Sequence, residues 1–221
     1  MGELLKSRWK GLLWLLAGVG LIALAWPFDV RVDSALDATG KPGLHALAWW
    51  CSKAGEGGII GEAGVFCCAI CFLLKQPRRA ADIFFITVTS SVTGLAAAIL
   101  KVPFGRTRPL NHEVPQGFYG MWHGGHWIAG KYLFSSFPSG HSASAVGLAA
   151  AAWLVHRGWG AVAAVYAAAV MWSRIALQCH HLSDVVASAV LSIPLAMLLK
   201  RVLARSVEFQ FDNLHRAWRG K

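Results

Sequence analysis

Residues 81–100 read ADIFFITVTSSVTGLAAAIL, twenty residues in which Asp82 is the only charged side chain. An α-helix needs about 20 predominantly apolar residues to cross the hydrocarbon core of a bilayer. Five further apolar runs lie along the chain, so the predicted spans are near 11–27, 57–74, 81–100, 141–156, 159–178 and 184–203. The sequence therefore predicts an all-α integral membrane bundle of about six transmembrane helices.

The composition also indicates a membrane protein. Hydrophobic residues make up 56% of the 221 residues and charged residues only 14%, whereas soluble domains average about a quarter charged residues. The apolar residues stand in long runs and no internal repeat divides the chain, so one membrane-embedded domain over 1–221 is expected. A net charge of +10 would suggest nucleic acid in a soluble protein. Here basic membrane-flanking loops and a cationic site explain it, and no nucleic-acid partner is expected.

Lysine and arginine are unevenly divided between the two sides of the predicted bundle. Thirteen of the twenty-one fall on one side and eight on the other. The thirteen are Lys6, Arg8, Lys10, Lys75, Arg78, Arg79, Arg157, Lys200, Arg201, Arg205, Arg216, Arg219 and Lys221. Because cytoplasmic loops are enriched in lysine and arginine, we expect both termini in the cytoplasm and the long connection 101–140 on the outer face.

The first apolar run permits two interpretations. Basic residues precede it and Ala-Leu-Ala stands at 23–25, a pattern found in cleaved signal peptides. The run continues to Trp26 and is followed by Pro27, which favours an uncleaved anchor. Cleavage would leave five spans with the connection 101–140 still outside.

Chemically competent side chains stand around the end of the fifth run. His180 and Asp184 are four residues apart, so on a helix the carboxylate can accept a hydrogen bond from one imidazole nitrogen and leave the other free as a nucleophile or base. Arg174 lies six residues before His180, where a guanidinium can clamp phosphate oxygens. A simple pairing of Arg174 with Asp184 is the alternative. His181 has Val185 at the fourth following position, so we do not expect it to be the nucleophile.

The tetrapeptide Pro138-Ser139-Gly140-His141 directly precedes the fourth run. Small residues at a helix N-terminus expose backbone N–H groups, and the helix dipole favours an anion there. Ser139 can cap the helix or bind phosphate, and His141 can give a proton to a leaving oxygen. Taken alone, the tetrapeptide is better explained as an N-cap turn with an interfacial histidine.

Two cations bracket the end of the third run. Lys101 and Arg108 are separated by a turn rich in glycine and proline. Alone they could simply extend to the membrane surface, but beside the other two motifs they predict convergence on one phosphate. Arg106 lies between them, and we expect it at the rim of the pocket with no chemical role.

Together the three stretches resemble the type 2 phosphatidic acid phosphatase (PAP2) superfamily. The matching residues are Lys101 with Arg108-Pro109, Pro138-Ser139-Gly140-His141, and Ser173-Arg174 with His180 and Asp184. The resemblance implies a six-helix PAP2-like fold, no metal or other cofactor, and a two-step displacement. His180 would attack phosphorus with Asp184 holding its ring, and His141 would protonate the leaving group and then activate water. The implied phosphate-binding residues are Lys101, Arg108, Ser139, Gly140 and Arg174.

The resemblance also implies a membrane lipid phosphatase of the bacterial inner membrane, with its active site facing the periplasm. The expected partner is a phosphorylated membrane lipid: lipid A or undecaprenyl diphosphate, or alternatively phosphatidylglycerophosphate. Phosphate transfer to another acceptor, transport of an anionic lipid or phosphate, and a catalytically inactive scaffold are the alternatives.

Other polar residues are assigned to packing or to the interface. Ser90, Ser91 and Thr93 lie within the third run and are expected to bond helices together. His123 and His126 supply two potential metal ligands without an adjacent third, so a headgroup lid is favoured over a metal site. For Glu62, contact with the site and a place at the membrane interface remain equally supported.

Overall fold

The computed structural model describes the backbone of residues 2–219 and the side chains of Trp9 and residues 11–203. Its helices are α1 (Gly2–Ala25), α2 (Asp29–Leu36), α3 (Pro42–Ala54), α4 (Gly57–Leu73), α5 (Pro77–Phe104), α6 (Gly140–Val155), α7 (Arg157–Ala176) and α8 (Leu182–Arg219). Short 3₁₀ turns cover Trp26–Phe28 and Tyr132–Phe134, and a two-stranded hairpin pairs β1 (Trp122–His123) with β2 (His126–Trp127). The predicted all-α membrane bundle is confirmed.

Each of the six predicted runs coincides with a helix, but not all of these helices span a bilayer by length alone. Four helical stretches of the described chain are long and apolar enough: Gly11–Leu36, Pro77–Phe104, Arg157–Ala176 and Leu182–Leu203. The pair α3 and α4 passes the same test together, with a bend of 56° at its break. Helix α6 has 16 residues and falls short. The number of spans therefore stays a prediction.

The polar stretch 28–55, which lies between the first two apolar runs, is mostly helical. It forms α2 and α3, and Pro42 stands in the first turn of α3, where its missing N–H has no helical partner to lose. Helix α2 buries Asp29 and Asp33, which lie one turn apart and share a face. Apolar periodicity cannot reveal such a helix, because its inward face is acidic.

Helix α6 forms the centre of the bundle and packs against α5, α7 and α8. Small side chains allow these close approaches, since a Cβ at Gly147 would lie 2.1 Å from Thr93 Oγ1. Thr93 Oγ1 also donates to Ala143 O at 2.9 Å, and Ser90 Oγ donates to Ser144 O at 2.9 Å. These two residues therefore join α5 to α6 as predicted. Ser91 instead bonds within its own helix.

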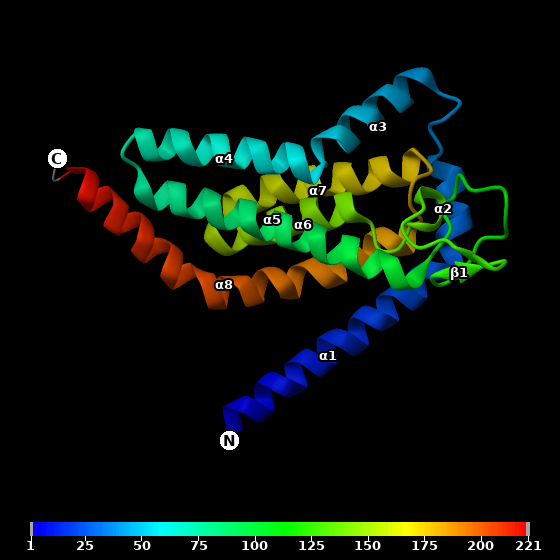
Figure 1. Cartoon of the computed structure of the whole chain (residues 1–221), viewed down its shortest axis with the longest axis horizontal. Coiled ribbons are helices and arrows are strands. Elements are labelled where there is room, and N and C mark those ends of the chain that lie inside the picture. Colours follow the sequence, from blue (N-terminus) through cyan, green and yellow to red (C-terminus); the bar gives the residue numbers. More distant parts are fainter. Residues whose placement is uncertain (1, 220–221) are drawn as a thin grey trace.

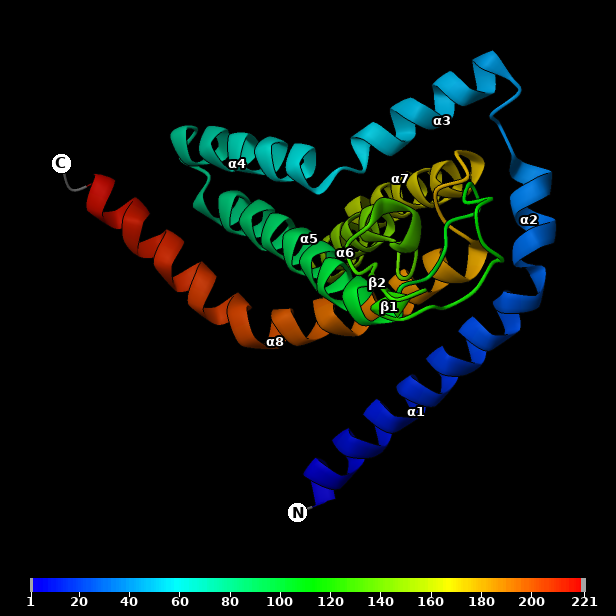
Figure 2. The same cartoon turned by 45° about the vertical axis from the view of Figure 1, so that its right-hand side comes forward.

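The connection between α5 and α6 covers one end of the bundle. Figure 1 shows these loops and α2 together at the right, while α1 begins and α8 ends away from them. Figure 2 shows α2 beside the loops and α1 diverging from the other helices. The ends of α5 and α7 and the starts of α6 and α8 all meet under these loops, so this end collects the predicted motifs.

The predicted membrane orientation depends partly on side chains that the structure does not describe. Of the basic residues assigned to the cytoplasmic side, Lys6, Arg8, Lys10, Arg205, Arg216, Arg219 and Lys221 lie outside the described side chains. The orientation therefore stays a prediction.

Candidate active site

The helix ends bring the predicted site residues to one end of the bundle. Lys101 lies in the last turn of α5 and Arg174 in the last turn of α7. Gly140 and His141 begin α6, and Asp184 lies in the first turn of α8. The remaining three stand in the connections: Arg108 follows α5, Ser139 is the N-cap of α6, and His180 lies between α7 and α8.

Lys101 and Arg108 meet at one carbonyl. Lys101 Nζ donates to Ser135 O at 3.0 Å, and Arg108 Nη2 donates to the same oxygen at 3.3 Å. Arg108 also donates to Tyr132 O at 2.8 Å and Cys179 O at 3.0 Å, and its guanidinium lies 3.8 Å from the centre of the Tyr132 ring. The bond to Cys179 O holds Arg108 beside the residue that precedes His180, and Lys101 shares the Ser135 carbonyl with it.

Arg174 is buried and only partly hydrogen-bonded. Its Nη1 donates to Ser52 Oγ from α3, while Nε is buried with no hydrogen-bond partner among the described residues. Its backbone oxygen accepts from the N–H groups of Cys179 and His180, each at 3.1 Å. A buried guanidinium nitrogen without a partner is costly, and an anionic oxygen would satisfy it. The structure places Ser52 here, although the sequence pattern did not reveal it.

His180 lies at the centre of these charges. Its side chain is 1% exposed, and Nδ1 stands 3.6 Å from Asp184 Oδ2, which is beyond hydrogen-bonding distance. Burial lowers the pKa of His180 well below its usual value, and the charges of Lys101, Arg108, Arg174 and His141 lower it further. The imidazole is therefore neutral near pH 7, the form that can act as a nucleophile.

Asp184 is fully buried and held by several donors. Its Oδ2 accepts from Ser136 Oγ at 2.5 Å and from the N–H of His181 at 2.9 Å, while Oδ1 accepts from Arg106. The expectation of Arg106 at the pocket rim is wrong, because its side chain is 4% exposed and pairs with this carboxylate. The alternative pairing of Asp184 with Arg174 is also not observed, since the cation that pairs with Asp184 among the described residues is Arg106.

His181 makes different contacts from its neighbour. Its Nδ1 lies 2.6 Å from Asp33 Oδ2 on α2, and Nε2 lies 3.1 Å from Thr107 O and 3.2 Å from Gln116 Oε1. Both ring nitrogens are thus occupied. This arrangement suits a structural role.

The start of α6 faces the same site. Ser139 Oγ accepts from the N–H of Ser142 at 3.4 Å, so it caps the helix. The N–H of Ser139 donates to Asp184 O at 3.3 Å, which joins the start of α6 to the start of α8. A Cβ at Gly140 would lie 4.0 Å from Lys101 Cε. The free N–H groups of α6 and the ammonium of Lys101 therefore lie on the same side.

Three other residues considered in the sequence lie on exposed surfaces. His123 and His126 pair across the β1–β2 hairpin, with both side chains exposed. Their exposure is compatible with the expected headgroup lid and does not test it. Glu62 is exposed on α4, which favours an interfacial position over a place in the site.

The family of the protein follows from the segment that matches a known family. Residues 79–208, more than half of the 221, match the PAP2 superfamily. The protein belongs to the PAP2 superfamily. All eight predicted catalytic and phosphate-binding residues fall within the matching segment, whereas Ser52 and the acidic residues of α2 lie outside it.

Two solved structures share the PAP2 fold of this protein. The crystal structure of the first transmembrane PAP2-type phosphatidylglycerolphosphate phosphatase from Bacillus subtilis is 21% identical, with a TM-score of 0.64 over 86% of this chain and 94% of that one. Aquifex aeolicus LpxE is 19% identical, with a TM-score of 0.52 over 79% of this chain and 95% of that one. No curated protein sequence matches this one. At these identities the comparison establishes the fold of a multi-pass membrane protein.

Proposed function

We propose that this PAP2 protein is a lipid phosphatase that removes phosphate from a membrane lipid mono- or diphosphate through a phosphohistidine intermediate on His180. The observation that carries this proposal is a buried, neutral His180 beside a carboxylate and surrounded by buried cations. A dianionic phosphate would offset the clustered positive charge and satisfy Arg174 Nε.

In the first step, His180 Nε2 attacks phosphorus, because Nδ1 faces Asp184. The P–O bond to the lipid breaks, and His141 gives its proton to the leaving oxygen. Arg108, Arg174 and Lys101 stabilise the charge on the transferring phosphoryl group, together with the Gly140 N–H. Asp184 stabilises the positive charge that develops on the imidazole.

In the second step, a water molecule attacks the phosphorus of phosphohistidine. His141 accepts a proton from the water, the P–N bond breaks, and inorganic phosphate leaves with neutral His180 regenerated. No residue of this scheme requires a metal ion. Ser139 supports the scheme by capping α6 and orienting its N–H groups toward the phosphate.

The proposed substrates are lipid A or undecaprenyl diphosphate, with phosphatidylglycerophosphate as a further candidate that the activity named for the Bacillus subtilis structure supports. The proposed location is the bacterial inner membrane. Both termini would be cytoplasmic and the site would face the periplasm, because the motif loops lie opposite the side richer in lysine and arginine.

Phosphate release by the purified, detergent-solubilised protein tests the proposal. The assay covers all three lipids with a chelator present, and His180→Ala runs beside the wild type. Metal-independent release that His180→Ala abolishes, together with acid-labile phosphate trapped on the wild type, would support the phosphohistidine route. Release that persists in His180→Ala, or that the chelator stops, would contradict it.

A further inference from the structure

Arg106 bridges two buried carboxylates behind the site. Its Nη1 donates to Asp184 Oδ1 and to Ser183 Oγ, the latter at 2.7 Å, while Nη2 donates to Asp29 Oδ2 at 2.6 Å. The guanidinium carbon lies 4.3 Å from the centre of the Trp26 ring. A planar guanidinium can serve both partners in one fixed geometry, whereas an ammonium cannot.

Asp29 holds the other side of this bridge. It is the first residue of α2 and is 5% exposed. Besides Arg106, it accepts from the N–H of Ser183 at 2.8 Å and from Ser183 Oγ at 2.7 Å. Asp29 therefore binds Arg106 and the first turn of α8 at once, one residue before Asp184.

The bridge determines which oxygen of Asp184 faces the nucleophile. Arg106 occupies Oδ1, so Oδ2 is the oxygen 3.6 Å from His180 Nδ1. Ser136 and the N–H of His181 also hold Oδ2, and together these donors prevent the carboxylate from rotating. Asp29 also balances the charge of Arg106, so the three groups keep one net negative charge beside the imidazole.

We propose that Arg106 and Asp29 are positioning residues for His180, which act through the orientation and charge of Asp184 and touch no substrate. This inference rests on the proposed phosphatase function. Asp29 lies outside the segment that matches the family, so the N-terminal helices would contribute to the chemistry of this chain as well as to its anchoring.

A second buried carboxylate on the same helix provides a matched control. Asp33 follows Asp29 by one turn, is also 5% exposed, and pairs with His181 Nδ1. No hydrogen bond or ion pair among the described residues joins its side chain to that of Asp184. Loss of Asp33 should weaken the attachment of α2 while leaving Arg106 and its bonds to Asp184 and Asp29 in place.

The test compares kcat and KM for Arg106→Gln, Arg106→Lys, Asp29→Asn and Asp33→Asn, each purified as a monodisperse species. The substrate is the lipid of the three-lipid panel that the wild type hydrolyses fastest. We expect Arg106→Gln to lower kcat about 100-fold and Asp29→Asn about 10-fold, with KM within about threefold, since small misplacements of reacting groups cost that much.

The remaining variants distinguish an effect on the orientation of Asp184 from a simple loss of the attachment of α2. Arg106→Lys should recover part of the lost kcat, and the Arg106→Gln/Asp29→Asn double variant should be no slower than Arg106→Gln alone, because Asp29 acts through Arg106. Asp33→Asn should lower the melting temperature but keep kcat within about twofold of the wild type. If Arg106→Gln does not fold, Arg106→Lys and Asp29→Asn still give the comparison with Asp33→Asn.

Three outcomes would overturn the inference. A raised KM with unchanged kcat in the Arg106 variants would mean that Arg106 binds substrate. Equal losses of kcat in Asp29→Asn and Asp33→Asn would mean that the contact between Arg106 and Asp29 only attaches α2 and does not position Asp184. A wild-type protein that releases no phosphate from any panel lipid would instead defeat the proposed function, and the inference with it.

Discussion

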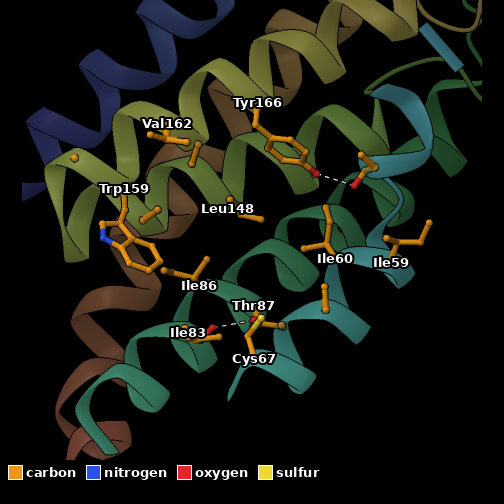
Figure 3. Close-up of a pocket in the computed structure, with 16 residues that line it drawn as sticks. Ile59, Ile60, Cys67, Ile83, Ile86, Thr87, Leu148, Trp159, Val162 and Tyr166 are labelled. Atoms are coloured by element: carbon orange, nitrogen blue, oxygen red, sulfur yellow. Dashed lines mark hydrogen bonds between the residues drawn. The ribbon is translucent and has the colours of Figure 1, made fainter. Parts of the chain in front are cut away.

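The site at the loop end and the groove along the side of the bundle use their polar atoms in opposite ways. The groove has a volume of about 680 Å³ and is lined by residues of α4, α5, α6 and α7 and by Ala54 at the end of α3 (Figure 3). Its Tyr166 hydroxyl donates to Ala54 O at 2.7 Å, and its Thr87 hydroxyl donates to Ile83 O at 2.8 Å. Both are thus satisfied by backbone.

The loop end instead leaves charged and titratable groups unsatisfied. Arg174 Nε and His180 Nδ1 are buried there without hydrogen-bond partners among the described residues. An apolar groove of this size is a typical ligand-binding site, but the reactive side chains of this protein lie at the loop end. Unsatisfied buried polarity is therefore the better guide to chemistry in this bundle, and the groove is suited to hydrocarbon.

The largest expected effect belongs to the carboxylate at the loop end. Asp184→Asn keeps the shape of the side chain but removes the charge that stabilises the imidazolium of His180. We expect kcat to fall about 10⁴-fold, as for the corresponding change in a serine protease triad. Phosphate release under single-turnover conditions measures it. Retention of a tenth of the activity would show that His180 does not depend on this carboxylate.

A smaller loss is expected at Arg174. Arg174→Lys keeps the positive charge at this position. The ammonium, however, cannot donate to both Ser52 and a phosphate as one planar guanidinium can. We expect kcat/KM to fall about 100-fold, the cost of losing one donor to a transition-state oxygen. Ser52→Ala is the matched control and should cost about tenfold or less, since it removes only the support of the guanidinium. A larger loss in Ser52→Ala would assign Ser52 a direct role.

The buried imidazole also predicts a pH dependence of stability. The pKa of His180 is well below the ordinary value of 6.5 in the folded protein, whereas the unfolded chain binds a proton near 6.5. The contribution of His180 to the free energy of unfolding is therefore fully present above pH 6.5. It is lost as pH falls from 6.5 toward the folded pKa, by up to about 1.4 kcal/mol per pH unit, because the unfolded chain then binds a proton that the folded protein does not.

Thermal unfolding in detergent between pH 7.5 and 5.5 measures this effect. The melting temperature of the wild type should fall with pH more steeply than that of His180→Gln, which has no titrating ring. Parallel curves for the two proteins would mean that His180 titrates normally, and would remove the neutral nucleophile from the proposed mechanism.

The motif spacings were sufficient to predict which residues would meet at one end, because each motif stands at the end of an apolar run and helix ends of a bundle lie together. The bridge through Arg106 was not predictable. Asp29 and Asp184 are far apart in sequence, and an arginine between two motif cations resembles one more solvent-exposed charge. The acidic α2 also has no apolar face for a pattern search to detect, so its role appeared only with the fold.

The smallest expected effect belongs to the groove. Tyr166→Phe removes the hydrogen bond to Ala54 O, which attaches α7 to the end of α3. The loss should destabilise the protein by about 1 kcal/mol, the net value of such a bond, seen as a lower melting temperature. The ring remains to fill the groove, so kcat and KM should stay within about twofold of the wild type.

A large change of KM in Tyr166→Phe would break the contrast between the two regions. It would mean that the hydroxyl contributes to substrate binding and that the groove binds part of the lipid. An unchanged KM with a lowered melting temperature would sharpen the contrast, because the Tyr166 hydroxyl would then act on stability alone. The effect of Tyr166→Phe on KM, more than its effect on the melting temperature, therefore decides whether recognition of the lipid substrate is confined to the loop end.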